Sequence, residues 1–253
     1  MNNNPTVTPM DYAKIEGRVH SVETFGALDG PGVRYVLFLK GCPLRCLYCH
    51  NPDAINPSGG LMMKAGDVVR NILDYKNYIR SGGVTISGGE PLLQPAFCEA
   101  VAKLLAPHGI PVALDTSGAV PLAGAKDAIN AAQMLLLDIK ALDPALCKQV
   151  TGQDNQNALT ILSYCESLNK PVIIRHVMVP GLTFDDEKLV ALADFLAPYR
   201  CVQKVELLPF SKLGEFKYKE LGRPYTLYDT PALTEKEAEH ARAIFRERGF
   251  DVL

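Results

Sequence analysis

The sequence predicts an α/β protein in which parallel strands alternate with helices. Short apolar runs recur six times along the 253 residues, and segments with a helical spacing of apolar residues separate them. Repeated strand–helix alternation produces parallel strands joined by right-handed crossovers. The runs are apolar on both faces, as a sheet covered on both sides requires.

The six predicted strands are short, apolar and rich in β-branched residues. They are RYVLFLK at 34–40, GVTISGG at 83–89, PVALDTSG at 111–118, QMLLLDIK at 133–140, PVIIRHVMVPG at 171–181 and VQKVELLPF at 202–210. Alternation alone leaves a doubly wound sheet and a complete or partial barrel open, and both place ligands at the carboxyl ends of the strands. We predict the partial (β/α)6 TIM-type barrel of parallel strands, in a single domain.

The segments between these runs predict helices that each bury one face. The clearest are AGDVVRNILDYKNYIR at 65–80, FCEAVAKLLAPHG at 97–109 and DDEKLVALADFLAPY at 185–199. The last predicted helix, TEKEAEHARAIFRERG at 234–249, begins with the pattern of a capping box and carries charges of both signs.

Composition indicates a globular protein without affinity for nucleic acid or membranes. Hydrophobic residues make up 47% and charged residues 21%, and the formal net charge is −2. No apolar run approaches the roughly 20 residues of a membrane span. The opening segment MNNNPTVTPMDYAK is polar and unlike a secretory signal. We predict a flexible tail over residues 1–14 and a folded domain over residues 15–253.

Seven cysteines indicate a reducing compartment, and we therefore expect a cytoplasmic protein. The number is odd, and the chain is longer than disulfide-stabilised domains usually are. Four cysteines stand alone in the later segments and are interpreted as small core residues. They are Cys98, Cys147, Cys165 and Cys201.

The remaining cysteines, Cys42, Cys46 and Cys49, lie within the single segment GCPLRCLYCHN. Their spacing suits one face of a helix, but Pro43 and the preceding glycine favour a loop. A zinc site with His50 as fourth ligand is a second interpretation, although structural zinc usually takes ligands from two separated places. An iron–sulfur cluster is the third, and with three thiolates one iron keeps an open position for a substrate.

Several segments together resemble a known family. CPLRCLYC resembles the cluster-binding signature of the radical S-adenosylmethionine (SAM) enzymes, and SGGEP resembles their second motif. With DGPGVR at 29–34, LDTSG, LLLDIK, IIRHVMVPG and ELLPF in the same order, the chain resembles the pyruvate formate-lyase activating enzymes, which are glycyl-radical activases. The resemblance runs from about Gly17 to the carboxyl terminus, and it implies that residues 15–253 form a radical SAM activase domain.

The resemblance implies a [4Fe–4S] cluster held by Cys42, Cys46 and Cys49, with SAM on the open iron. It further implies that one electron cleaves SAM and that a 5′-deoxyadenosyl radical takes the Cα hydrogen of a glycine in a partner enzyme. The implied partner is pyruvate formate-lyase, and the implied electron donor is a flavodoxin or ferredoxin. We expect a monomer that binds neither nucleic acid nor membrane.

The resemblance also assigns the residues around the cofactor. Those expected to contact SAM or pack on it are Tyr48, Cys49, His50, Gly88, Gly89, Glu90, Asp138, Ile139, Lys140, Arg175 and Ser211. Asp138 and Lys140 share a face of their strand opposite Ile139, and an ion pair between them is the alternative. Ser211 stands where the family carries a histidine. Asp29 and Arg34 are expected to line the groove for the partner's glycine loop.

A monovalent cation is predicted beside the cofactor carboxylate. Asp115 and Asp138 end neighbouring strand runs, and Thr116 adds a hydroxyl oxygen. Such hard oxygen ligands suit alkali cations, and the alternative is that Lys140 and Arg175 supply the counter-charge.

Two further functions stay open at this point. The first is activation of another glycyl-radical enzyme, although the absence of cysteines between Cys49 and Glu90 leaves no room for the ferredoxin-like insert of some such activases. The second is a zinc-stabilised binding module without catalysis.

Overall fold

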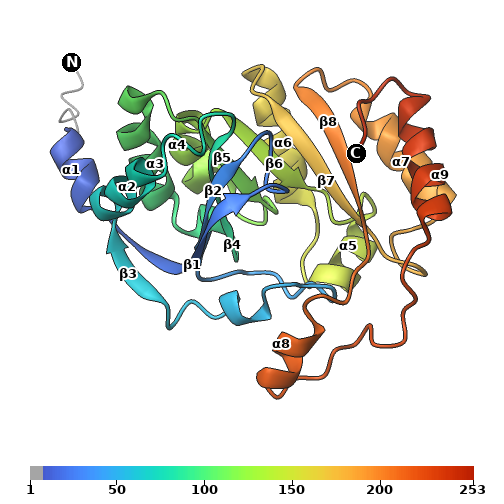
Figure 1. Cartoon of the computed structure of the whole chain (residues 1–253). Helices are drawn as coiled ribbons and strands as arrows, with labels where there is room; N and C mark the ends of the chain where they lie inside the picture. Colours follow the sequence, from blue (N-terminus) through green and yellow to red (C-terminus); the bar gives the residue numbers. More distant parts are fainter. Residues whose placement is uncertain (1–7) are drawn as a thin grey trace.

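The computed structural model describes residues 8–253 and contains one eight-stranded sheet with the order β3-β1-β2-β4-β5-β6-β7-β8 (Figure 1). The six parallel strands are β2 (Arg34–Leu39), β4 (Gly83–Gly88), β5 (Val112–Thr116), β6 (Met134–Asp138), β7 (Val172–Met178) and β8 (Val202–Pro209). Each lies within one of the six predicted runs, so the predicted parallel strands are confirmed.

Two strands were missed by the sequence analysis. β1 (Glu16–Gly26) pairs antiparallel with β2, and β3 (Leu61–Lys64) pairs antiparallel with β1. Both carry many exposed residues, because β3 is the edge strand and β1 lies next to it, paired with β3 only at its first residues, and they therefore lack the apolar runs of the inner strands. β3 and β8 stay unpaired with each other, so the barrel is partial, as predicted.

The helices lie along the outer face of the sheet, except α8, which lies apart from it beside the 3-10 turn η1 (Figure 1). They are α1 (Pro9–Lys14), α2 (Ala65–Asp74), α3 (Pro95–Leu105), α4 (Leu122–Ala131), α5 (Pro144–Thr151), α6 (Gln156–Ser167), α7 (Asp186–Leu196), α8 (Glu215–Glu220) and α9 (Glu235–Arg246), with 3-10 turns η1 (Pro52–Ala54), η2 (Pro91–Leu93) and η3 (Ala106–His108). In the part of the chain that the structure describes, no helix has the length and apolar character needed to cross a membrane.

The two ends of the chain differ in how well they were predicted. The predicted capping box of α9 is present, with Thr234 and Glu237 bonded reciprocally. The first seven residues of the predicted tail lie outside the described residues, whereas α1 occupies most of its remainder. Tyr12 of α1 packs on the core and its hydroxyl donates to Glu99 at 3.1 Å, which explains why α1 is part of the folded domain.

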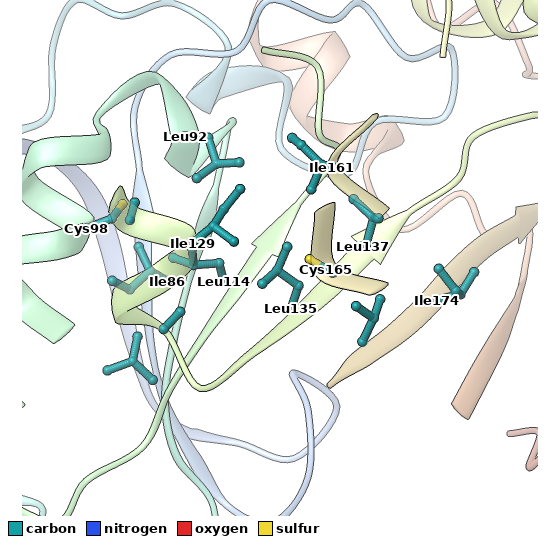
Figure 2. Close-up of a cluster of buried hydrophobic side chains, with 14 of the residues drawn as sticks. Ile86, Leu92, Cys98, Leu114, Ile129, Leu135, Leu137, Ile161, Cys165 and Ile174 are labelled. Carbon is teal, nitrogen blue, oxygen red and sulfur yellow. The ribbon is translucent and has the colours of Figure 1, made fainter. Parts of the chain in front are cut away.

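The core fills the space between the sheet and its covering helices. Figure 2 shows Leu135 and Leu137 of β6 packing with Ile86, Leu114 and Ile174 of neighbouring strands. Cys98 and Cys165 lie in this core, and Cys147 and Cys201 are also buried, so the prediction that the lone cysteines are core residues is confirmed.

Candidate functional site

The carboxyl ends of the parallel strands surround a cavity of about 630 Å³. It is lined by side chains of both charges, by glycines and by all three clustered cysteines. Purely structural strand ends do not require this mixture, and the α/β architecture places ligand sites at this end of the sheet. The cavity is therefore the candidate active site.

The segment from Cys42 to Cys49 is a loop, so the interpretation as thiols on a helix is wrong. Its backbone is held from two directions: Cys42 N donates to Ile55 O at 3.0 Å, while Arg45 N and Leu47 N donate to Thr151 O at 2.7 Å and Val150 O at 2.9 Å. These bonds present the three thiols to one cavity.

The three thiols are ligands of the type that an iron–sulfur cluster takes. No three His, Cys, Asp or Glu side chains within residues 8–253 are arranged to hold a single ion. A zinc ion needs its ligands about 2.3 Å away, whereas an iron–sulfur cluster attaches each thiolate to a different iron and so accepts wider spacing. Burial raises the pKa of Cys42 to about 11 and that of Cys46 to about 12, so binding of a cationic group must drive their deprotonation.

His50, the fourth ligand in the zinc interpretation, contacts the chain after β8. His50 is exposed, and its Nε2 lies 3.1 Å from the carbonyl oxygen of Ser211. Both residues line the cavity, as expected of residues near the cofactor, but the His50 ring bonds across to the chain after β8.

Gly88 and Gly89 line the cavity as predicted. Their small size is also required by the fold: a Cβ on Gly88 would lie 2.2 Å from Leu39 N, and one on Gly89 would lie 2.1 Å from Gly41 O. Gly88 has a φ of +116°, which favours glycine. The turn thus packs directly on the chain that enters the cysteine loop.

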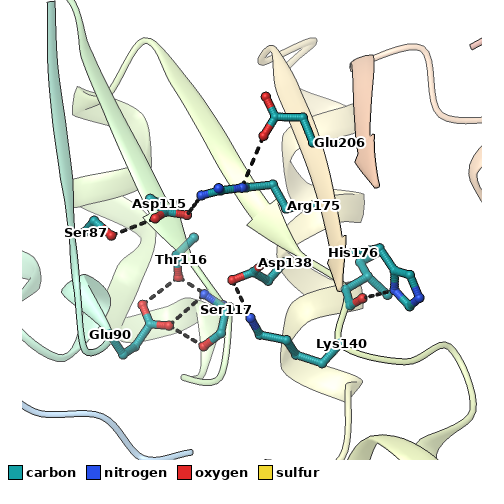
Figure 3. A network of polar contacts seen from close by, with 12 residues as sticks. Ser87, Glu90, Asp115, Thr116, Ser117, Asp138, Lys140, Arg175, His176 and Glu206 are labelled. Atoms are coloured by element: carbon teal, nitrogen blue, oxygen red, sulfur yellow. Dashed lines mark hydrogen bonds and ion pairs between the residues drawn. The ribbon is translucent and has the colours of Figure 1, made fainter. Parts of the chain in front are cut away.

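Glu90, expected to contact SAM, is absent from the cavity lining. It is fully buried, and its carboxylate accepts from Thr116 Oγ1 at 2.5 Å and from Ser117 N at 2.9 Å (Figure 3). Leu92 N donates to it at 3.0 Å. Glu90 therefore fastens the end of β4 to the end of β5.

Asp138 and Lys140 line the cavity and form an ion pair, with 2.7 Å between Lys140 Nζ and Asp138 Oδ2 (Figure 3). The predicted shared face is confirmed, because Ile139 is fully buried in the core. Ile139 itself therefore does not offer its side chain to a cofactor. Burial alone would lower the pKa of Lys140, but Asp138 raises it above its ordinary value, so Lys140 stays charged.

Tyr48 is an unusual buried residue beside this pair. Its ring centroid is 5.9 Å from Lys140 Nζ, and its buried hydroxyl has no hydrogen-bond partner among residues 8–253. A buried hydroxyl without a partner is costly in a folded chain. A ligand in the cavity that Tyr48 lines would satisfy it.

Arg175 is paired with two carboxylates (Figure 3). Its Nη1 lies 3.2 Å from Asp115 Oδ1, and its Nε lies 3.2 Å from Glu206 Oε2, although this N–H is not aligned for a hydrogen bond. Ser87 Oγ donates to Asp115 Oδ2 at 2.6 Å. Sequence analysis missed Glu206 and Ser87, and the signal for Glu206 was a single carboxylate within the run VQKVELLPF.

The predicted cation site is only partly assembled. Asp115 and Asp138 both line the cavity, but Arg175 and Lys140 already supply counter-charges, as the alternative held. The Thr116 hydroxyl donates to Glu90 and accepts from Gly118 N at 2.9 Å. Adjacent residues of a strand point to opposite faces, so this hydroxyl does not face the cavity with Asp115.

The segment DGPGVR divides into a cavity-lining part and a buried anchor. Gly30 and Pro31 line the cavity, whereas Arg34 is only 2% exposed. Arg34 donates to Thr85 Oγ1 and Val84 O, both at 2.5 Å, and to Pro31 O at 3.2 Å. The expectation that Arg34 lines the groove is therefore wrong, because its guanidinium is used to hold the turn.

Asp29 is half-buried next to this turn and is absent from the cavity lining. Thr85 Oγ1 donates to the Asp29 carbonyl oxygen at 2.6 Å. Burial raises the pKa of the Asp29 carboxyl, and the nearby charge of Asp115 adds to this rise.

Comparison with known proteins agrees with this site. The family model of the radical SAM superfamily matches residues 36–193. The chain is 38% identical over 254 residues to a pyruvate formate-lyase-activating enzyme of Streptococcus mutans, with 97% of each chain covered. It is 40% identical over 235 residues to one of Clostridium pasteurianum, which covers 92% of this chain and 98% of that relative.

The fold is shared more widely. The structure of QueE from Escherichia coli superposes with a TM-score of 0.59 at 14% identity and covers 98% of this chain and 97% of QueE. At this level of identity the likeness concerns the fold alone.

Proposed function

The chain belongs to the radical SAM superfamily and, within it, to the pyruvate formate-lyase-activating enzymes, and from this membership we propose that it generates a glycyl radical in pyruvate formate-lyase. The observation that carries the proposal is the set of three thiols on one loop, facing a cavity at the carboxyl ends of the strands. Activation of a different glycyl-radical enzyme stays the nearest alternative.

In this proposal Cys42, Cys46 and Cys49 hold three irons of a [4Fe–4S] cluster. When bound, the reduced cluster and SAM supply the electron transfer and hydrogen abstraction that the reaction requires. The chain's own residues bind and orient. Lys140 offers its ammonium to the SAM carboxylate, and the buried Tyr48 hydroxyl gains a partner from the ligand.

The carboxylates Asp115, Asp138 and Glu206 suit the positive groups of SAM. SAM carries a sulfonium and an ammonium, and a dry site with paired charges strengthens such contacts. Arg175 holds Asp115 and Glu206 in place, which makes it a positioning residue in this proposal rather than the direct carboxylate contact expected from the sequence.

The turn after β1 has the properties expected of a surface that binds the glycine loop of the partner enzyme. Leu28 is 83% exposed at the mouth of the cavity, beside Gly30 and Pro31. An apolar, glycine-containing rim suits an extended peptide that must bring a Cα–H close to the cofactor. We further propose that the enzyme is a cytoplasmic monomer that takes its electron from a flavodoxin or ferredoxin.

Anaerobic reconstitution tests the proposal. We expect about four irons per chain, loss of most of this iron in Cys46→Ala, and its retention in the matched variant Cys98→Ala, whose cysteine lies in the core. The reduced protein should then produce a glycyl radical in pyruvate formate-lyase, measured by electron paramagnetic resonance. A colourless protein that binds one zinc ion would instead support the binding module.

The predicted monovalent cation stays a proposal carried by Asp115 and Asp138. SAM affinity measured in potassium, sodium and tetramethylammonium buffers of equal ionic strength tests it. Weaker binding in tetramethylammonium alone supports the cation, and equal affinity in all three buffers refutes it.

A further inference from the structure

The segment that follows β8 lies over the end of the cysteine loop. Helix α8 packs against η1, the turn that comes just after Cys49 (Figure 1). The approach is close at Gly214, where a Cβ would lie 2.8 Å from both Cys49 O and His50 Cα. Backbone contact this tight leaves no room for water between the segment and the loop at this point.

One side chain of α8 makes the polar connection. Lys217 Nζ lies 2.9 Å from Asn51 Oδ1 and 3.1 Å from Asp53 Oδ1. The ammonium therefore bridges two residues of the segment that directly follows Cys49.

Asp53 is in turn fixed to the sheet. His20 Nε2 of β1 lies 2.8 Å from Asp53 Oδ2, and Lys40 Nζ, after β2, donates to Asp53 O at 2.6 Å. The connection thus runs from α8 through Asp53 to β1 and to the residue that follows β2, and in the described part of the chain Lys217 is the α8 side chain that makes it.

Helix α8 has little else to hold it. It has six residues, none of them buried, and Phe216 is 58% exposed. Buried Phe210 and Leu227 anchor the chain on either side of it. Tyr218 adds one aromatic contact, with its ring centroid 5.1 Å from that of Tyr225, but a helix this short is marginal by itself, so loss of the Lys217 contact should loosen the docking of α8.

We propose that Lys217 is a positioning residue that docks α8, through Asn51 and Asp53, as a cover over the loop ending in Cys49, and that this cover slows the loss of cluster iron. Lys217 is absent from the cavity lining, so it acts through the loop and not on a ligand. The inference rests on the proposed cluster site, but its first test does not require a cluster.

The first test is hydrogen exchange of the α8 amides in the metal-free chain. We expect Lys217→Met to raise exchange in residues 215–221 by roughly fivefold. The matched control is Lys219→Met, which removes the same charge from the same helix at an exposed position without an ion pair among residues 8–253. Lys217→Arg should restore protection, because arginine keeps the charge and the donors.

The second test is the rate of iron loss to a chelator from the anaerobically loaded protein. We expect Lys217→Met to lose iron roughly fivefold faster than the wild type and Lys219→Met to lose it within about twofold of the wild-type rate. Asp53→Asn should resemble Lys217→Met, and the double variant should be no faster than either single variant.

Three outcomes would overturn the proposal. Unchanged exchange in Lys217→Met removes the docking role. Raised exchange with unchanged iron loss removes the cover role. Equal acceleration by Lys219→Met assigns the effect to the loss of positive charge alone. A chain that takes up no cluster would contradict the proposed function, whereas the exchange experiment would still decide whether Lys217 docks α8.

Discussion

Two buried arginines show how differently one residue type is used on the two sides of this cavity. Arg34, beneath the DGPGVR turn, donates only to neutral oxygens, and burial lowers its pKa to about 10. Burial would also lower the pKa of Arg175, but Asp115, Asp138 and Glu206 raise it above its ordinary value. Both guanidiniums are charged at neutral pH, but the charge of Arg34 is opposed only by nearby Asp29, whereas Arg175 is surrounded by three carboxylates.

The difference separates a structural role from a role in the site. The contacts of Arg34 close a turn and leave nothing for a ligand, whereas Arg175 has an N–H that no hydrogen bond uses and carboxylates that face the cavity. A buried charge with neutral partners stabilises local structure, while a group of opposite charges around a cavity can rearrange when a charged ligand enters.

The largest expected effect comes from Arg175→Met. Removing the cation leaves Asp115 and Glu206 unbalanced, which should cost about 3 kcal/mol of unfolding free energy at pH 7 and weaken SAM binding at least ~10-fold. The folded-state pKa of Glu206, already raised mainly by burial, should rise further. The destabilisation should therefore be present at pH 7 and disappear as pH falls below the unfolded pKa of the carboxyls.

Urea unfolding at pH 7 and pH 4 and calorimetric titration with SAM measure these effects. A destabilisation of the same size at both pH values would show that packing, and not charge balance, explains the role of Arg175.

Arg34→Met should have the next largest effect, of a different kind. Thr85 Oγ1, Val84 O and Pro31 O lose a donor, which should cost about 2 kcal/mol of unfolding free energy. These three partners do not titrate, so most of the loss should be present at both pH 7 and pH 4, with a small further loss at pH 7 because the charge of Arg34 opposes the rise in the pKa of Asp29. SAM affinity should change by less than about twofold. Arg18→Met is the control, since Arg18 makes an exposed bond to Gly59 O. A large loss of SAM affinity in Arg34→Met would show that Arg34 also serves the site, and would contradict the distinction between the two arginines.

Asp29→Asn should have the smallest effect. Burial, followed by the charge of Asp115, raises the folded-state pKa of Asp29, so the wild type loses stability as pH rises from the unfolded to the folded pKa. The neutral variant does not lose this stability. Its free energy of unfolding should be about 0.5 kcal/mol higher than that of the wild type at pH 7 and the same at low pH. Thermal unfolding across pH 3–7 tests this, and a less stable variant at pH 7 would mean that the carboxylate has a favourable partner.

The parts of the site that the sequence could predict depend on local pattern. Three thiols within one loop and the polar ends of apolar runs indicated where the chemistry lies. The two-residue period of a strand correctly placed Asp138 and Lys140 opposite Ile139. The six parallel strands followed from six strand–helix units, whereas β3, at the edge of the sheet, and its neighbour β1 have exposed residues and gave no apolar run.

The parts that could not be predicted depend on which face of a strand meets the cavity and on distant partners. Thr116 and Glu90 were assigned to the cavity, but the strand that ends in Thr116 and the strand that precedes Glu90 are apolar on both sides, so the pattern does not show which side chains face the cavity. Arg175 and Glu206 are directly opposite each other across β7 and β8, and only the register of those strands brings them together. Partners of this kind are separated by a whole helix in the sequence.

The backbone bonds that shape the cysteine loop also determine when during synthesis the loop can adopt its structure. Arg45 and Leu47 bond to Thr151 and Val150, which a ribosome adds about 100 residues later, some 5–20 seconds at bacterial speeds. Until then the loop lacks the frame that orients its thiols, because contacts so distant in sequence form late. The three cysteines therefore stay ordinary thiols at least until Thr151 has been added, and in the proposed function iron and sulfide are delivered after that point.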